Sequence, residues 1–102
     1  MILAKVEGCV VASKKNAKMT GNKFLLVRPI VIDSLNAVEF KPSASTLVAI
    51  DSLGAGENEV VLVVQGSSAR LGADSPDSPV DAVVIGIVDT VDISKKILYR
   101  AH

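Results

Sequence analysis

The chain contains two kinds of apolar pattern. The first runs through residues 2–13, where Ile2, Ala4 and Val6 share one parity and charged residues fill much of the other. This period of two predicts a strand with one buried face. Gly8 interrupts the alternation and predicts a bend or a bulge within that strand.

The second pattern is apolar on both parities and occurs in residues 23–32, 60–65 and 81–89. Such segments predict strands that are buried on both faces. A shorter strand is predicted over residues 46–51, and the pattern of residues 94–100 is compatible with a short terminal strand. Because almost no segment has a helical period, we expect a neighbouring subunit to cover the outer face of these strands.

Turn signals separate the predicted strands. Pro29 cannot donate a ladder hydrogen bond and therefore predicts a sheet edge or a break. Residues 33–45 are predicted to be a loop anchored by Phe40, and residues 66–70 a turn with a serine helix cap followed by one helical turn. Five short strands with these turns predict an all-β fold, a small OB-like Greek-key β-barrel with one short helical turn.

The composition is unusually apolar for a domain of this size. A chain of 102 residues is predicted to form a single domain over residues 1–102. Hydrophobic residues make up 49% of it and the mean hydropathy is +0.44. No apolar run approaches the about 20 residues of a membrane-spanning helix, and the first residues lack a signal-peptide pattern. We therefore expect part of the apolar material to form surface interfaces.

The charge balance argues against a nucleic-acid-binding OB domain, the main alternative for a barrel of this kind. Eleven basic residues balance eleven acidic ones, so the chain has no general field to attract nucleic acid or an anionic membrane. Aromatic residues make up only 3%, which leaves few platforms for base stacking. The single cysteine, Cys9, excludes an intrachain disulfide and fits a cytoplasmic protein.

The glycine-rich segment Gly54-Ala55-Gly56 invites comparison with dinucleotide-binding loops. That fingerprint requires a third glycine at position 59, where this chain has Glu59. It also requires a helix after the glycine-rich loop, and no helical pattern follows in this sequence. The segment is therefore predicted to be a turn in which glycine permits a positive φ and a close backbone approach.

The turn at residues 66–70 has two interpretations. Its backbone amides and the Arg70 guanidinium could converge on a small anion. Alternatively it is a capped turn in which Arg70 pairs with a carboxylate of the same or a neighbouring chain, such as Asp81 or Glu59. The second interpretation is favoured, because a capped turn needs no ligand.

The sequence offers no arrangement typical of a catalytic or metal site. Asp74, Asp77 and Asp81 are spaced by a few residues, but a calcium loop needs denser oxygen ligands, a central glycine and a closing glutamate. Ser67 or Ser68 could act as a nucleophile only beside a general base, and the one histidine, His102, is the last residue. We therefore expect no enzymatic activity, no cofactor and no metal.

Four segments in order resemble one known family. They are residues 8–15, 20–27, 49–70 and 79–89. They resemble the vertex proteins of bacterial microcompartment shells, the EutN/CcmL family. Members commonly show Asp-Thr-Val-Gly-Ala-Gly where residues 51–56 of this chain read Asp-Ser-Leu-Gly-Ala-Gly, a conservative change that leaves the turn chemistry intact.

This resemblance implies an OB-like barrel that assembles into a homo-pentamer. Such pentamers close the five-fold vertices of a polyhedral shell in the bacterial cytoplasm, beside hexameric shell proteins that tile its facets, and they carry no catalytic activity. Segments 8–15 and 20–27 favour a metabolosome over a carboxysome. Candidate residues for contacts between subunits are Gly54, Ala55, Gly56, Glu57, Glu59, Arg70 and Asp81.

Overall fold

The computed structural model describes residues 1–12, 23–33, 39–66, 81–93 and 95–101. These residues contain strands and no helix. The strands are β1 (Ile2–Val10), β2 (Lys23–Asp33), β3 (Glu39–Pro42), β4 (Leu47–Asp51), β5 (Val60–Gln65), β6 (Ala82–Ile87), β7 (Thr90–Ile93) and β8 (Lys96–Arg100). Within the described ranges, no helix has the length and apolarity needed to cross a membrane.

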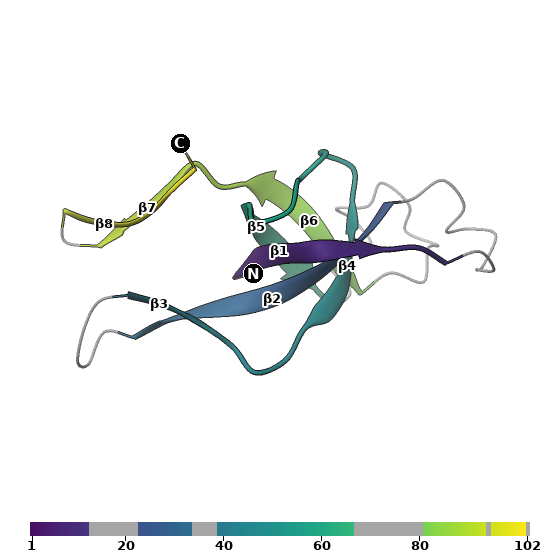
Figure 1. Ribbon diagram of the computed structural model, residues 1–102, viewed down its shortest axis with the longest axis horizontal. Coiled ribbons are helices and arrows are strands. Elements are labelled where there is room, and N and C mark those ends of the chain that lie inside the picture. Colours follow the sequence, from purple (N-terminus) through teal and green to yellow (C-terminus); the bar gives the residue numbers. More distant parts are fainter. Residues whose placement is uncertain (13–22, 34–38, 67–80, 94, 102) are drawn as a thin grey trace.

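Five of the strands close into a barrel (Figure 1). The strand order is β1-β5-β6-β4-β2, and β2 pairs back onto β1 to complete the circle. All pairings in the barrel are antiparallel except the one between β4 and β6, which is parallel. Strands that are distant along the chain are thus neighbours in the sheet, and the predicted all-β, OB-like barrel is confirmed.

Small aliphatic side chains fill the inside of the barrel. Successive residues of a strand point to opposite faces, so every second residue points inward. The inward residues are Ala4, Val6, Leu25, Val27, Ala49, Val61, Val63, Ala82 and Val84, together with Ala55 from the turn after β4. Alanine and valine suit the narrow interior of a five-stranded barrel. The chain therefore seals this core by itself.

Two irregularities lie where the sequence predicts them. The register between β1 and β2 shifts between Val6 and Gly8, which confirms the bulge at Gly8. Strand β2 pairs with β1 up to Pro29 and with β3 from Ile30 onward. Pro29 therefore marks the point at which β2 leaves the barrel, although β2 continues through it without the break that was one of the two predicted possibilities.

Two segments differ from the sequence prediction, and a third cannot be compared. Residues 33–45, predicted to be a loop, contain the strand β3, which pairs with the protruding end of β2. The terminal strand is confirmed as β8, but its partner β7 is not among the predicted strands. Both missed strands have only four residues, too few to establish a period. The predicted helical turn after residue 66 lies outside the described residues.

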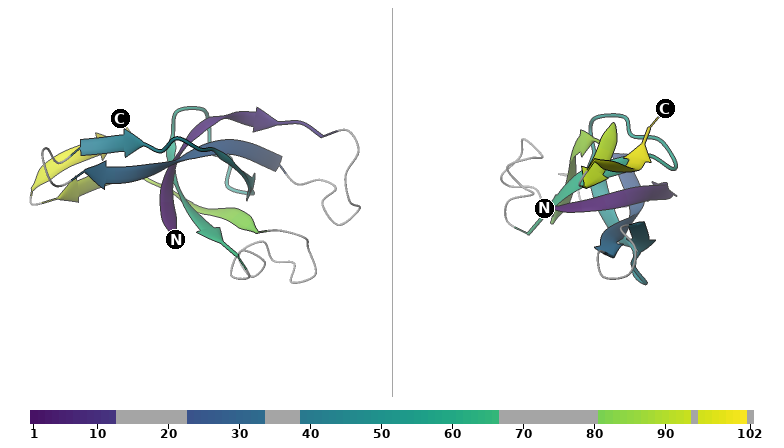
Figure 2. Two further views of the ribbon diagram at one scale, coloured as in Figure 1. Left: turned by 90° about the horizontal axis from the view of Figure 1, so that it is seen from below. Right: turned by 90° about the vertical axis from the view of Figure 1, so that its left-hand side faces the viewer.

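Strands β7 and β8 form a separate hairpin, which we call the arm. The arm pairs with no strand of the barrel. Figures 1 and 2 show it reaching away from the barrel on the same side as β3 and the end of β2. The arm and the paired ends of β2 and β3 thus project from the same end of the barrel.

Candidate subunit interface

The outward side chains of four barrel strands form a continuous apolar surface. It consists of Phe24 and Leu26 of β2, Val48 and Ile50 of β4, Leu62 and Val64 of β5, and Val83 and Ile85 of β6. We call this surface the apolar face. The strand pairing places its members side by side, because Ile50 lies opposite both Phe24 and Val83, and Val83 lies opposite Val64.

The centre of the apolar face is packed, two of its members are exposed, and the others are half-buried. Ile50 and Val83 form a small cluster with Phe24 and Val64 and are only 6% and 1% exposed. By contrast, Val48 is 46% exposed and Ile85 is 39% exposed. Large aliphatic groups left open in a contiguous patch are typical of surfaces that bind another protein. The two-sided apolar strands of the sequence prediction are thus present, with one side inside the barrel and the other on this surface.

The turn after β4 is held by a buried carboxylate. Asp51 is 3% exposed. Its Oδ1 accepts a hydrogen bond from the Leu53 amide at 2.8 Å, and its Oδ2 accepts bonds from the amides of Gly54 and Ala55 at 3.1 and 2.8 Å. An acidic side chain followed by amides that fold back on it forms an Asx-type turn. Gly54 has a φ of +82°, which confirms the positive φ predicted for this turn.

The same turn is also tied to β1. The amide of Asn58 donates to the Val6 carbonyl at 2.8 Å, and the Val6 amide donates to the Glu59 carbonyl at 2.9 Å. The Glu59 side chain is used within the turn, because its Oε1 accepts a bond from the Gly56 amide at 2.5 Å. The turn is therefore a rigid part of the barrel wall.

The predicted interface residues occupy different environments. Gly54 and Glu57 are exposed, and Gly56 and Glu59 are half-buried. Ala55 is 1% exposed and belongs to the core of its own chain. A contact of this turn with another subunit therefore depends on the exposed backbone and on Glu57, and it stays a prediction.

The remaining two predicted interface residues lie at the end of the barrel where β6 begins. Asp81 is exposed, directly precedes β6, and accepts a hydrogen bond on its carbonyl from the Gly66 amide at 2.8 Å. Gly66 itself has a φ of +73°, as a turn after β5 requires. Arg70 lies outside the described residues, so neither interpretation of its turn is tested.

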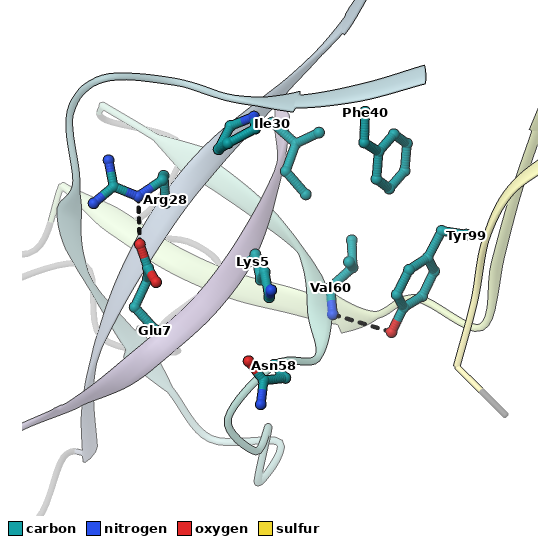
Figure 3. Close-up of a pocket in the computed structure, with 9 residues that line it drawn as sticks. Lys5, Glu7, Arg28, Ile30, Phe40, Asn58, Val60 and Tyr99 are labelled. Atoms are coloured by element: carbon teal, nitrogen blue, oxygen red, sulfur yellow. Dashed lines mark hydrogen bonds and ion pairs between the residues drawn. The ribbon is translucent and has the colours of Figure 1, made fainter. Parts of the chain in front are cut away.

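A second candidate surface lies between the barrel and the arm (Figure 3). It is an open cavity of about 430 Å³, which we call the arm groove. Its lining combines aliphatic and aromatic groups with charged ones: Lys5, Glu7, Arg28, Ile30, Phe40, Pro42, Asn58, Val60 and Tyr99. These residues come from β1, from the outer half of β2, from β3, from the start of β5 and from the arm.

On the side of the arm, Tyr99 forms the wall of the arm groove. Its ring stacks on Phe40 of β3, with centroids 6.1 Å apart and an interplanar angle of 16°. Its hydroxyl oxygen accepts a hydrogen bond from the Val60 amide at 3.3 Å (Figure 3). Phe40 was predicted to be an anchor, and this stacking identifies Tyr99 as its partner. One side chain thus links the arm to both β3 and the barrel.

A charged pair closes the opposite side of the arm groove. The Arg28 guanidinium forms a salt bridge with Glu7 and donates a second hydrogen bond, from Nη1, to the Ser43 carbonyl at 2.9 Å. The side chains of Arg28 and Glu7 are 32% and 36% exposed, so their pairing adds little stability. The pair instead places the Arg28 guanidinium and the Glu7 carboxylate together at the rim of the groove.

The arm groove was missed at the sequence level. Its residues are far apart in the chain, and although the strand β8 was predicted, the short alternation of Val91 and Ile93 was too brief to predict its partner β7. As for chemistry, no group of three or more His, Cys, Asp or Glu side chains among the described residues could hold a metal ion. Cys9 is a free, exposed cysteine.

Comparison with known proteins identifies one family. Residues 1–89 match the family model described as ethanolamine utilisation protein EutN/carboxysome. The chain is 46% identical over 99 residues to the carboxysome shell vertex protein CcmL of Gloeobacter violaceus, covering 97% of this chain and 93% of that protein.

Solved structures agree with this relationship. A structure of the ethanolamine utilization protein EutN superposes with a TM-score of 0.87 at 39% identity and covers all of both chains. The GrpN pentameric microcompartment shell protein of Rhodospirillum rubrum superposes with a TM-score of 0.78 at 42% identity, covering 91% of this chain and 99% of that one.

Proposed function

This chain belongs to the EutN/CcmL family, and we propose that it is a structural protein whose pentamers cap the five-fold vertices of a bacterial microcompartment shell. The names of its relatives support this proposal, because they include a carboxysome shell vertex protein and a pentameric microcompartment shell protein. The chain acts as one domain over residues 1–102, in the cytoplasm. It needs no cofactor and catalyses no reaction.

The apolar face is the observation that carries the proposal. A single chain leaves Val48 and Ile85 substantially exposed on a surface that is otherwise aliphatic. Removing such groups from water contributes about 25 cal/mol per Å² of apolar area. Association with other copies of the chain therefore stabilises this surface in a way that the monomer cannot.

The role of a pentamer in a shell is geometric. A layer of hexagonal units is flat, and a closed polyhedron requires points of five-fold symmetry. Hexameric shell proteins are therefore the expected neighbours of the ring, and its outer sides would dock on their edges. The preference for a metabolosome over a carboxysome stays a prediction, because carboxysome and ethanolamine-utilisation proteins are both similar to this chain.

The test is the mass of the purified protein in solution. Native mass spectrometry and light scattering should find one species at five times the 10.6 kDa of a single chain. Coexpression with hexameric shell proteins should then give closed polyhedra in electron micrographs, and omission of this chain should leave open shells. A stable monomer at micromolar concentration, or closed shells without this chain, would exclude the proposal.

A further inference from the structure

The arm is a two-stranded hairpin with little support from its own chain. Isolated two-stranded hairpins are marginally stable in water. Among the described residues, the arm is joined to the rest of the chain by the Tyr99 contacts with Phe40 and Val60. The bond from the Ala101 amide to the Asp89 carbonyl, at 2.8 Å, continues the β7–β8 pairing within the hairpin. Ile97 of β8 is 48% exposed. The arm therefore has apolar area to bury and few groups of its own chain to bury it against.

The arm groove and the apolar face are centred on different strands of the barrel and adjoin along β2 and β5. The apolar face covers β5, β6, β4 and the first half of β2, whereas Lys5, Glu7 and Arg28 of the groove project from β1 and the second half of β2. In the strand order, β1 lies across the barrel from β6 and β4. Outward side chains of these strands therefore point in opposing directions, and one chain cannot place its own apolar face in its own groove.

The two surfaces also differ in shape and chemistry. The arm groove is a cavity with Lys5 and the Arg28–Glu7 pair on its rim. The apolar face is the outer surface of a barrel, and its exposed members Val48 and Ile85 are aliphatic. A cavity and the outer surface of a barrel have shapes that can fit each other. A two-fold dimer would cover only one of them, whereas a head-to-tail contact repeated around a closed ring covers both in every copy.

We propose that the arm groove of one copy receives the apolar face of the next copy, so that each subunit contributes both halves of one repeated contact. This inference rests on the proposed ring and specifies which surfaces build it. In such a contact, Tyr99 and Phe40 form the apolar floor under the neighbour's Ile85.

Charge complementarity supports this orientation. The arm carries three exposed cationic residues, Lys95, Lys96 and Arg100, and one exposed carboxylate, Asp92, so its net charge is positive. The apolar face is flanked by the exposed carboxylate of Asp81, directly before β6. Opposite charges at the rim of an interface increase the association rate and select the correct register. The predicted role of Asp81 at the interface would then be to face the arm of the next subunit.

Cross-linking between two engineered cysteines tests the inference directly. Cys9 is the single cysteine of the chain and is exposed, so Cys9→Ser provides a cysteine-free background. Ile85→Cys then marks the apolar face, and Pro42→Cys marks the arm groove, where Pro42 is exposed. A short bis-maleimide tolerates separations of the two residues that a disulfide would not.

The variant with both cysteines should give a ladder of linked species that ends at five chains. Each single-cysteine variant should stay uncross-linked, since neither surface meets its own counterpart in a head-to-tail ring. Dimers formed by a single-cysteine variant would overturn the inference, because they require a two-fold contact.

Native mass spectrometry of the same samples separates this inference from the proposed function. An intact ring of five without cross-links in the double variant would reject the groove contact and leave the vertex function standing. A wild-type protein that forms no ring would reject both. Melting curves of the variants confirm that each has folded before it is scored.

Discussion

The inner and outer faces of the barrel strands carry similarly apolar residues but differ in how far their side chains are exposed. Inside the barrel, Val61 and Val63 of β5 are fully buried, at 0% exposure. Outside, Ile85 of the neighbouring strand β6 is 39% exposed, although it is larger. The inner face is closed by the circular order of the strands, which needs one chain only. The outer face has no second layer among the described residues, since neither a helix nor another sheet covers it there.

This difference separates folding from assembly. A substitution on the inner face acts on the monomer, because the barrel cannot close around a wrong side chain. A substitution at an exposed position of the apolar face, such as Ile85, acts on the contact between copies, because the monomer leaves much of that side chain in water. The arm belongs with the outer face, since its Tyr99 joins it to the barrel through few contacts.

The largest effect is expected from a charge inside the barrel. Val61→Asp should place an unpaired carboxylate in a site with 0% exposure and destabilise the fold by about 4 kcal/mol or more. That is a large part of the about 5 to 15 kcal/mol by which a folded domain is stable. Circular dichroism and thermal melting should show a largely unfolded protein. The matched control is Leu62→Asp on the apolar face, which should fold. A native melting transition in Val61→Asp would contradict the conclusion that the barrel interior at Val61 is closed to water.

Removal of the Asp51 carboxylate should have the next largest effect. Asp51→Ala would leave the amides of Leu53, Gly54 and Ala55 without their acceptor, at a cost of about 2 to 4 kcal/mol. Asp51→Asn keeps one acceptor oxygen and should lose less. Urea denaturation measures both variants, with the exposed Asp89→Ala as a control that should change stability by about 0.5 kcal/mol or less. Equal stability of Asp51→Ala and wild type would show that the turn holds without its carboxylate.

A charge on the apolar face should weaken the ring and spare the fold. Ile85→Asp should raise the dissociation constant of the assembly at least tenfold, about 1.4 kcal/mol per contact. The reason is that the exposed carboxylate must lose its water when the next copy binds. Dilution series in light scattering measure the change, and Ile85→Val serves as the conservative control. Rings that resist dilution as well as wild type would place the subunit contact elsewhere.

Backbone strain at the turn should have a smaller effect. Gly54 has a φ of +82°, and a Cβ added there would meet no atom within 4 Å. Gly54→Val should therefore cost about 1 to 3 kcal/mol through backbone strain alone. Gly54→Asn should recover part of this loss because asparagine tolerates a positive φ. Thermal melting checks the order of the variants, and an order with Val above Asn would contradict the argument.

The smallest effect is expected at the attachment of the arm. Tyr99→Phe keeps the ring that stacks on Phe40 and removes the oxygen that accepts from the Val60 amide. The loss should be about 1 kcal/mol. Hydrogen exchange should show faster exchange of the Val60 amide and the β7–β8 amides in the free monomer. Tyr99→Ala should accelerate this exchange further. If both variants exchange at the wild-type rate, the arm is held by other contacts.

Most of the barrel could be predicted from local pattern. The strands that became β1, β2, β4, β5 and β6 were predicted within a few residues of their observed ends. The bulge at Gly8 and the positive φ at Gly54 followed from glycine chemistry. The outer apolar face was also predictable. Alternate residues of a strand point to opposite faces, so a strand that is apolar on both parities has one apolar side inside the barrel and another outside it.

The candidate contact surfaces were only partly predictable. The turn candidates Gly54, Gly56 and Glu57 were chosen because glycine and acidic residues cluster there, and their interface role stays a prediction. Ala55 shows the limit of that reasoning, since its place in the barrel core depends on how β4 and β5 are joined. The arm groove was missed, because Phe40 and Tyr99 are 59 positions apart and meet only in the fold.

By itself, the sequence of this protein determined the period of its strands, the position of its turns and the excess of apolar side chains. Those properties depend on the chemistry of residues that are close along the chain. Only the tertiary structure decided that β2 closes the barrel against β1 and that a groove opens beside Tyr99. These features depend on pairings between distant segments, whose free energy is gained only when the whole barrel has formed.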